Sequence, residues 1–344
     1  MESNGINNNN GGGGRLRWWH LPFLAVLVIG TIAVVGGDKP TPYIKERGTV
    51  FGTIYNVTYQ SPVSLQGDIE AALAEVDASL SMFNPHSTIA LVNAAEGEVA
   101  VGDDSLFCRV MSLARHVSEQ TGGAFDITVA PLVNAWGFGT DGARMPDSAQ
   151  VDSLLAITGY RMIEMRGDTI VKGDPRVRLD CSAIAKGLGS DRVALMMERH
   201  GVGNFMIEIG GEMVVRGVND KGEPWRIGVA KPVDDTLALS QEVDTVMRLS
   251  NAAIATSGNY RNFYYKDGKK YAHTIDPHTG YPVQHNILSS TVIAPDCATA
   301  DAYATAFMVM GLEGAQEVVK RHPELKVYFI CNDDEGRLYT WTSE

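Results

Sequence analysis

The sequence predicts an α+β fold of mixed sheets with packed helices. Segments with helical and strand patterns follow one another without the regular βαβ rhythm of a parallel-sheet protein. A chain of 344 residues with 44% hydrophobic content can build a sizeable core, in one large domain or two closely packed ones. The formal net charge of -12 argues against a nucleic-acid partner, because binding to phosphates requires basic patches.

The N-terminal residues predict export. Residues 1–14 are rich in Asn and Gly, and we expect this low-complexity leader to be disordered. Residues 15–37 combine basic residues and tryptophans with an apolar run that would span roughly 25 Å as a helix, against ~30 Å of hydrocarbon core. This pattern fits a signal anchor or a cleavable signal peptide, and a buried soluble helix is the alternative. We therefore expect the domain from residue 44 to 344 to be exported.

Residue periodicity predicts the first elements of that domain. Residues 49–59 alternate between apolar and polar types as a strand does. Residues 68–80 and 104–120 have helical spacing, and the second of these helices ends at a glycine pair. Residues 147–157 also read as a helix, and residues 162–171 read as a short hairpin.

The second half of the domain contains two further helices among strands. A helix is predicted over 186–200, and a strand over 205–216 is bent at Gly210-Gly211. A helix from Ala300 to Gly311, capped by Thr299, is apolar nearly all round and should be buried. Further strands are predicted at 225–230, 245–249, 289–294 and 326–331.

The four cysteines, at 108, 181, 297 and 331, do not form a metal-binding pattern. None of them has Cys-x-x-Cys spacing or a histidine at metal-ligand spacing, so we expect no zinc site. One or two disulfides and four buried thiols are both compatible with the sequence.

Two polar residues share one face of the helix from Ala300. Asp301 and Thr305 are four residues apart, and a lone carboxylate on a buried helix is costly unless it has a partner. A hard cation such as Mg²⁺ would satisfy it, because this ion prefers carboxylate, hydroxyl and carbonyl oxygens. Alternatively, Asp301 merely favours the helix N-terminus through the helix dipole.

The segment from Leu179 to Gly187 could contact an anionic ligand. Its small residues permit close approach of the backbone, and Lys186 at a helix start could reach a phosphate or a carboxylate. The alternative is a structural ion pair between Asp180 and Lys186.

The segment from Thr121 to Gly139 places aromatic residues beside an acid. Phe125 or Trp136 could stack on a flat ring, and Asp126 could accept a hydrogen bond from a ring N-H. Aromatic residues at this spacing more often belong to the core, which is the alternative.

Residues 251–280 are dense in polar groups and are divided by Pro277 and several glycines. Such turns on a scaffold often carry functional sites. Asp276-Pro277 with Thr279-Gly280 is also a good tight-turn sequence, so part of this stretch could simply be a turn that aims His273.

These motifs together resemble the ApbE family of FAD:protein FMN transferases, over about Gly48 to Gly314. The family's pieces occur in register as Phe51-Gly52-Thr53, Ser81-Met82-Phe83 with Ser87 and Asn93, Ala124-Phe125-Asp126, Asp180 through Lys186-Gly187, Gly210-Gly211, Thr256-Ser257-Gly258, His273-x-x-Asp276-Pro277 with Gly280, and Asp301 with Thr305.

The resemblance implies a Mg²⁺-dependent enzyme that binds FAD and transfers its FMN half through a phosphoester bond to a Thr or Ser hydroxyl of an exported acceptor protein, releasing AMP. It implies metal ligands at Asp301, at Thr305 and at the backbone carbonyl of Ala183. The acceptors of this family are membrane redox subunits, so the catalytic domain is expected on the periplasmic side of the inner membrane. The implied FAD contacts are Phe51, Phe83, Ala124, Phe125, Asp126, Asp180, Lys186, His273 and Ile275.

The chemistry of such a transfer assigns further expectations. Ser257 and Gly258 are expected to contact phosphate or flavin, and the backbone N-H groups of Gly258 and of Gly210-Gly211 could donate to phosphate oxygens. His273 is the candidate proton acceptor for the attacking hydroxyl, and Asp301 contributes through the metal.

The chain departs from the family pattern at four positions. Phe51 stands where the family usually has Met, Phe83 stands where it often has Tyr, and Cys181 and Ser182 replace glycines. The hydroxyl missing at Phe83 leaves open a Mg²⁺-dependent FAD pyrophosphatase that produces FMN and AMP. A non-catalytic flavin-binding protein is the alternative from a different class.

Overall fold

The computed structural model describes residues 41–139, 145–233, 242–260, 262–333 and 335–343, together with Val26. The predicted leader at 1–14 lies outside the described residues, and so does the predicted signal segment at 15–37 except for Val26. None of the helices in the described part of the chain is long and apolar enough to span a membrane. Tyr43 to Glu344 form one compact unit.

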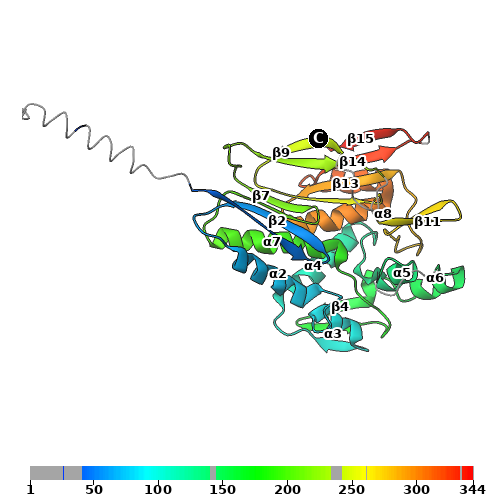
Figure 1. Ribbon diagram of the computed structural model, residues 1–344. Coiled ribbons are helices and arrows are strands. Elements are labelled where there is room, and N and C mark those ends of the chain that lie inside the picture. The colour runs from blue at the N-terminus through cyan, green and yellow to red at the C-terminus, as the bar shows by residue number, and fades with distance from the viewer. Residues whose placement is uncertain are drawn as a thin grey trace, which may run out of the picture. The chain divides into compact units, whose positions relative to one another are not determined.

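An eight-stranded antiparallel sheet organises this unit (Figure 1), which confirms the predicted α+β class. Neighbouring strands of the sheet are, in order, β1 (Tyr43–Val50), β2 (Thr53–Gln60), β6 (Phe205–Ile209), β7 (Glu212–Arg216), β10 (Ala252–Gly258), β13 (Ile287–Ala294), β14 (Lys326–Asn332) and β15 (Leu338–Thr342).

Two predicted single strands are hairpins in the structure. The stretch 49–59 turns at Phe51-Gly52, where both residues have positive φ angles of 51° and 72°. The stretch 205–216 turns at Gly210-Gly211, with φ angles of 62° and 113°. The alternation of residue types continues across a two-residue turn, so the pattern alone does not reveal the reversal.

Helices cover one face of the sheet, and a two-stranded ribbon covers the other. Figure 1 shows α2 (Gln66–Leu80), α7 (Ser182–Arg199) and α8 (Cys297–Arg321) along the same side. On the opposite side, β8 (Trp225–Ala230) and β9 (Val243–Leu249) form a ribbon. An apolar cluster joins it to the sheet through Val215, Trp225, Ile227 and Ile254.

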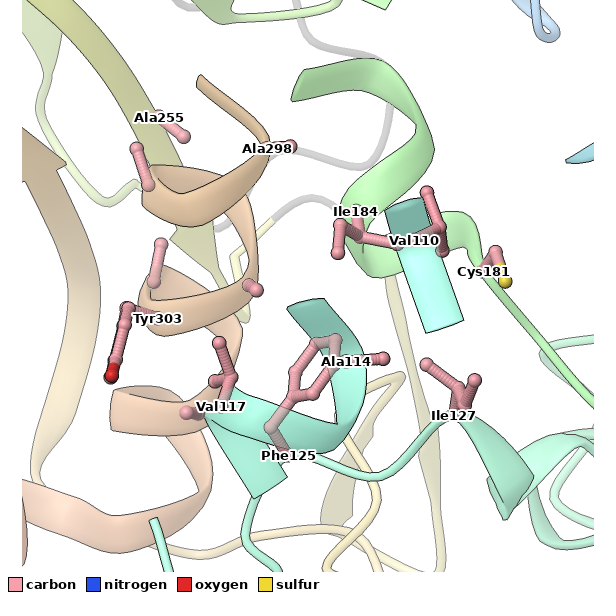
Figure 2. Packing of buried hydrophobic residues seen from close by; sticks show 14 of the residues in the cluster. Val110, Ala114, Val117, Phe125, Ile127, Cys181, Ile184, Ala255, Ala298 and Tyr303 are labelled. Atoms are coloured by element: carbon pink, nitrogen blue, oxygen red, sulfur yellow. The ribbon is translucent and has the colours of Figure 1, made fainter. Parts of the chain in front are cut away.

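The main core lies where α4 (Ser105–Gln120) meets α7 and α8. Val110 and Ala114 of α4 belong to the same buried cluster as Ile184 of α7 and Tyr303 of α8 (Figure 2). The remaining elements are α3 (Thr88–Ala94), β3 (Glu98–Ala100), η2 (Ile127–Val129), α5 (Ala130–Ala135), α6 (Ser148–Leu155), η3 (Tyr160–Met162), β4 (Ile163–Arg166), β5 (Thr169–Lys172), β11 (Phe263–Lys266) and β12 (Lys269–Ala272).

The helix predicted from Ala300 to Gly311 is part of a longer helix. Helix α8 begins at Cys297, and the carboxylate of Asp296 accepts the Thr299 N-H at 2.9 Å, so the predicted cap at Thr299 is wrong. The aspartate is the better cap because its oxygen reaches the N-H three residues on. Gly311 ends the first part with a φ of 71°, and the helix continues beyond this kink to Arg321.

The starts of α7 and α8 lie in direct contact, and this packing positions the site described below. A Cβ atom at Gly187 would overlap the carbonyl oxygen of Cys297, so only glycine permits this approach. Asp191 of α7 accepts the backbone N-H groups of Cys297 and Ala298 at 2.8 and 2.9 Å. A side chain of one helix therefore caps the other.

All four cysteines are free thiols. Cys108 is half-buried, and Cys181, Cys297 and Cys331 are buried. Of the two arrangements that the sequence permitted, the structure contains the one without disulfides.

Candidate active site

A cavity of about 490 Å³ collects residues that are far apart in the sequence. Its walls come from the segments around residues 82, 125, 180, 210, 257, 273 and 301. Thirteen of the residues that the sequence suggested for metal binding, FAD binding or catalysis line it: Phe83, Ala124, Phe125, Asp126, Asp180, Ala183, Lys186, Ser257, Gly258, His273, Ile275, Asp301 and Thr305.

Phe51 does not line this cavity. Its ring lies against α7 at Gly189, where an added Cβ atom would come within 2.8 Å of the Phe51 ring. The proposed FAD contact of Phe51 stays a prediction. Trp136 also lies away from the cavity walls: it is buried, stacks on Tyr271 and donates its ring N-H to the Gly280 carbonyl at 2.7 Å. For Trp136, the core alternative is confirmed.

The Asp301 carboxylate is buried, and the protein groups around it balance its negative charge only in part. Only 1% of the residue is exposed, and its Oδ2 atom accepts the Gly187 N-H at 3.1 Å. Its Oδ1 atom lies 3.9 Å from the Nζ atom of Lys186, which is long for a hydrogen-bonded ion pair. Burial raises the pKa of this carboxyl, against the opposing effect of Lys186. Helix α8 begins at Cys297, so Asp301 lies in its second turn, beyond the first turn where the helix dipole acts most strongly.

The oxygen atoms around Asp301 suit a hard cation. The hydroxyl of Thr305 lies 3.1 Å from the hydroxyl of Ser257, so β10 and α8 present their hydroxyls together. Ala183 lies in the first turn of α7 and lines the same cavity as Asp301 and Thr305. Carboxylate, hydroxyl and carbonyl oxygens are the donors that Mg²⁺ prefers, so these residues fit a magnesium ion.

Lys186 pairs with a residue that the sequence analysis missed. Its Nζ atom lies 2.8 Å from the Oε1 atom of Glu212, whereas Asp180 accepts the Ser182 N-H at 2.7 Å. The alternative of an Asp180 to Lys186 ion pair is therefore wrong. Burial disfavours the ammonium, but the two carboxylates of Asp301 and Glu212 outweigh it and raise the pKa of Lys186. Glu212 follows Gly210-Gly211 directly. An acidic residue at the start of a buried strand is the sequence feature that could have marked Glu212 as a site residue.

The Gly210-Gly211 turn does not offer free donors to a phosphate in this structure. The N-H of Gly210 donates to the Ile54 carbonyl, and the N-H of Gly211 donates to the Glu208 carboxylate, both at 3.1 Å. The expectation that this pair cradles phosphate is corrected accordingly. The pair serves as the turn that places Glu212 in the cavity wall.

His273 follows β12 and presents its ring to the cavity. Its Nδ1 atom lies 3.3 Å from the backbone carbonyl of Asn262, which can only accept, so this contact assigns the proton to Nδ1. The Nε2 atom is then the one that can take up a proton. Burial lowers the pKa of His273, the Asn262 carbonyl opposes this, and the positive charge of Lys186 lowers it further. The ring is therefore held neutral near pH 7.

The Asp126 carboxylate accepts several hydrogen bonds from groups within the protein. Its Oδ1 atom accepts the N-H and the hydroxyl of Thr128 at 2.8 and 2.7 Å, and its Oδ2 atom accepts the Tyr160 N-H at 2.6 Å. Burial raises the pKa of this carboxyl although these bonds lower it. Asp126 therefore shapes the cavity wall, and its bond to a ligand N-H stays a prediction.

The turn expected after His273 is confirmed. The N-H of Gly280 donates to the Asp276 carbonyl at 2.8 Å, and the Asp276 side chain accepts the His278 N-H at 2.9 Å. Gly280 has a φ of 74°, which a residue with a side chain rarely adopts. This tight turn returns the chain towards the sheet after the segment that contains His273.

Comparisons with known proteins decide the family. A family model described as the ApbE family matches residues 51–329. The chain belongs to the ApbE family. It is similar to the FAD:protein FMN transferase of Vibrio cholerae, with 35% identity over 319 residues that cover 90% of this chain and 94% of that protein. It is also 36% identical to the enzyme of the same name from Salmonella typhimurium over 308 residues, 86% of each chain.

Solved ApbE structures share the fold. The flavin transferase ApbE from Vibrio cholerae matches with a TM-score of 0.80 and 35% identity, covering 89% of this chain and 98% of that one. The apo form of the Pseudomonas stutzeri flavinyl transferase ApbE matches with a TM-score of 0.76 and 29% identity, covering 88% and 95% of the two chains. The chain is thus a transferase of the ApbE family.

This ApbE protein has an unusually exposed aromatic residue at its cavity. Phe83 lines the cavity although 79% of the residue is exposed to solvent. The expected contact of Phe83 with FAD stays a prediction.

Proposed function

We propose that this protein is a Mg²⁺-dependent FAD:protein FMN transferase that attaches FMN through a phosphoester bond to a Thr or Ser hydroxyl of an acceptor protein. One observation carries the proposal: the buried, incompletely compensated carboxylate of Asp301 shares one cavity with Lys186 and His273. The names of the relatives support the same reaction.

The residues of the cavity have different roles in this reaction. Asp301, Thr305 and the Ala183 carbonyl would hold Mg²⁺, which supplies charge neutralisation at the diphosphate of FAD. Lys186 adds a fixed positive charge on the same side. The apolar walls at Phe125 and Ile275 exclude water from the reacting groups.

His273 takes the proton in the transfer step. The acceptor hydroxyl oxygen attacks the phosphorus of the FMN half, its proton passes to Nε2 of His273, and the bond to the AMP phosphate breaks. AMP leaves, and the new phosphoester bond joins FMN to the acceptor. A neutral imidazole suits this role, because a positioned base near neutrality typically contributes about 10²- to 10⁴-fold in rate.

We further propose that the acceptor is an exported redox-complex subunit and that the transferase domain works on the periplasmic side of the inner membrane. The composition of residues 15–37 supports this proposal: basic residues and tryptophans precede an apolar run. Separating membranes from soluble periplasm, followed by detection of the chain, tests the placement. Recovery of the whole chain from the cytoplasm would contradict it.

The reaction is tested by incubating the full-length protein with FAD, Mg²⁺ and a threonine-bearing acceptor domain. Covalent flavin on the acceptor, seen by in-gel fluorescence and by mass, together with one AMP for each flavin, is the expected result. AMP without labelled acceptor would instead identify a FAD pyrophosphatase. Intact FAD would identify a flavin-binding protein. An acceptor domain with alanine in place of the threonine is the control.

A further inference from the structure

Glu212 is a buried acid for which the proposed reaction has no stated use. It opens β7, and only 3% of its side chain is exposed. Its Oε1 atom lies 2.8 Å from Lys186, and within the described residues its buried Oε2 atom has no hydrogen-bond partner. A buried carboxylate is expensive without full compensation, so its place beside the cavity calls for a reason.

Lys186 stands between two carboxylates and is much closer to one of them. Its Nζ atom lies 2.8 Å from Glu212 and 3.9 Å from Asp301. The lysine stem passes over Gly210, where an added Cβ atom would come within 3.3 Å of the Lys186 Cδ atom. The glycine turn therefore serves two purposes: it aims Glu212 at the cavity and leaves room for the lysine to reach it.

We propose that Glu212 is a positioning residue that holds the Lys186 ammonium away from Asp301, so that the Oδ1 atom of Asp301 stays available to a divalent cation. A buried ammonium needs a carboxylate partner, and without Glu212 the nearest one is Asp301. Lys186 would then occupy the oxygen that the cation requires. This inference rests on the magnesium site of the proposed function.

The charges of the group agree with this arrangement. Burial raises the pKa of Glu212 to about 8, against the opposing charge of Lys186. When both carboxylates and the ammonium are ionised, the group carries a single negative charge, which a divalent cation turns into a single positive charge. A positive site suits a diphosphate. A direct pair between Lys186 and Asp301 would instead neutralise the site before the cation arrives.

The test measures metal binding directly, without FAD or turnover. Mn²⁺ replaces Mg²⁺ as a paramagnetic probe, and its binding to the full-length protein is followed by electron paramagnetic resonance. Glu212→Gln should weaken Mn²⁺ binding about 10- to 100-fold, the range typical for loss of a residue that supports a metal ligand. Glu198→Gln is the matched control, because Glu198 forms an ion pair with Arg216 at the surface, and it should bind Mn²⁺ as the wild type does.

A second substitution separates positioning from a merely structural role. In Glu212→Gln with Lys186→Met, the competing ammonium is gone, so Mn²⁺ binding should recover towards the wild-type value. Wild-type affinity in Glu212→Gln, or no recovery in the double variant, would overturn the inference. If Glu212→Gln does not fold, as judged by circular dichroism, Lys186→Met alone decides: binding at least as tight as wild type supports the inference, and weaker binding overturns it.

Failure of the inference and failure of the proposed function give different results. A wild-type protein that binds Mn²⁺ but never labels an acceptor contradicts the transferase function and leaves the role of Glu212 standing. A wild-type protein that labels the acceptor while Glu212→Gln binds Mn²⁺ normally contradicts only the role of Glu212. A wild-type protein that binds no Mn²⁺ overturns the inference.

Discussion

The backbone N-H of Gly187 donates to the Oδ2 atom of Asp301 at 3.1 Å, and this bond ties the start of α7 to α8 beside the cavity. It fixes the carboxylate with one oxygen held by the protein. The other oxygen faces Lys186 at 3.9 Å, a distance that leaves it open to a stronger partner. The geometry therefore ties one oxygen of this side chain to the protein backbone and leaves the other open to the proposed metal ion.

Asp301→Asn should abolish metal-dependent turnover while leaving the fold intact. The amide oxygen of asparagine can still accept the Gly187 N-H, but the charge that attracts the cation is lost. A bound metal contributes several kcal/mol to such a transition state, so we expect a fall of about 100-fold or more in AMP release. Initial rates measured across a Mg²⁺ titration provide the check. Retention of Mg²⁺-dependent activity would remove Asp301 from the metal site.

Gly187→Ala should destabilise the protein because the helices cannot keep their separation. The new methyl group would overlap the Cys297 carbonyl, which is backbone and cannot simply rotate away. Overpacking of this kind costs about 1 to 3 kcal/mol, measurable by urea denaturation. Gly67→Ala is the matched control: this glycine of α2 has open space around it, and alanine favours helix. Equal stability of both variants would refute the close-packing argument.

The sequence predicted most of the elements because the periodic segments are long and apolar on one side. Helices at 68–80 and 104–120 and the hairpin at 162–171 lie where the pattern placed them. The turns at Phe51-Gly52 and Gly210-Gly211 were not recognised as strand reversals, because apolar alternation runs through a tight hairpin unchanged.

The sequence indicated which residues carry chemistry in the cavity, but it did not indicate which of them pair with one another. Asp301, Lys186 and His273 stood out because each carries chemistry in an otherwise apolar or turn-rich segment. Their pairing depends on how α7 packs against α8 and on the path of one lysine stem, and neither is a local property of the sequence. Glu212 escaped notice for this reason: its partner is 26 residues away in the chain, on another element.

Phe83→Ala should impair FAD binding without affecting stability. The ring is 79% exposed, so its removal should change the free energy of unfolding by no more than about 0.5 kcal/mol. Its position in the cavity wall predicts a higher KM for FAD with a smaller change in kcat. Val63→Ala, at another exposed apolar residue, should alter neither quantity. An unchanged KM for FAD would exclude Phe83 from the binding site.

The pH profile of transfer should report His273. Its pKa is lowered from the usual 6.5 by burial, so the neutral, proton-accepting form predominates at pH 7 and the charged form accumulates only at lower pH. We therefore expect the titration of His273 to leave kcat/KM constant around pH 7. At lower pH, kcat/KM should fall with an apparent pKa below 6.5, as His273 becomes protonated. His273→Gln should lose about 10²- to 10⁴-fold in rate and should lose that acid limb. His322→Gln is the control, because His322 pairs with Glu324 away from the cavity and should leave the profile unchanged. An acid limb that persists in His273→Gln would assign the proton acceptor to another group.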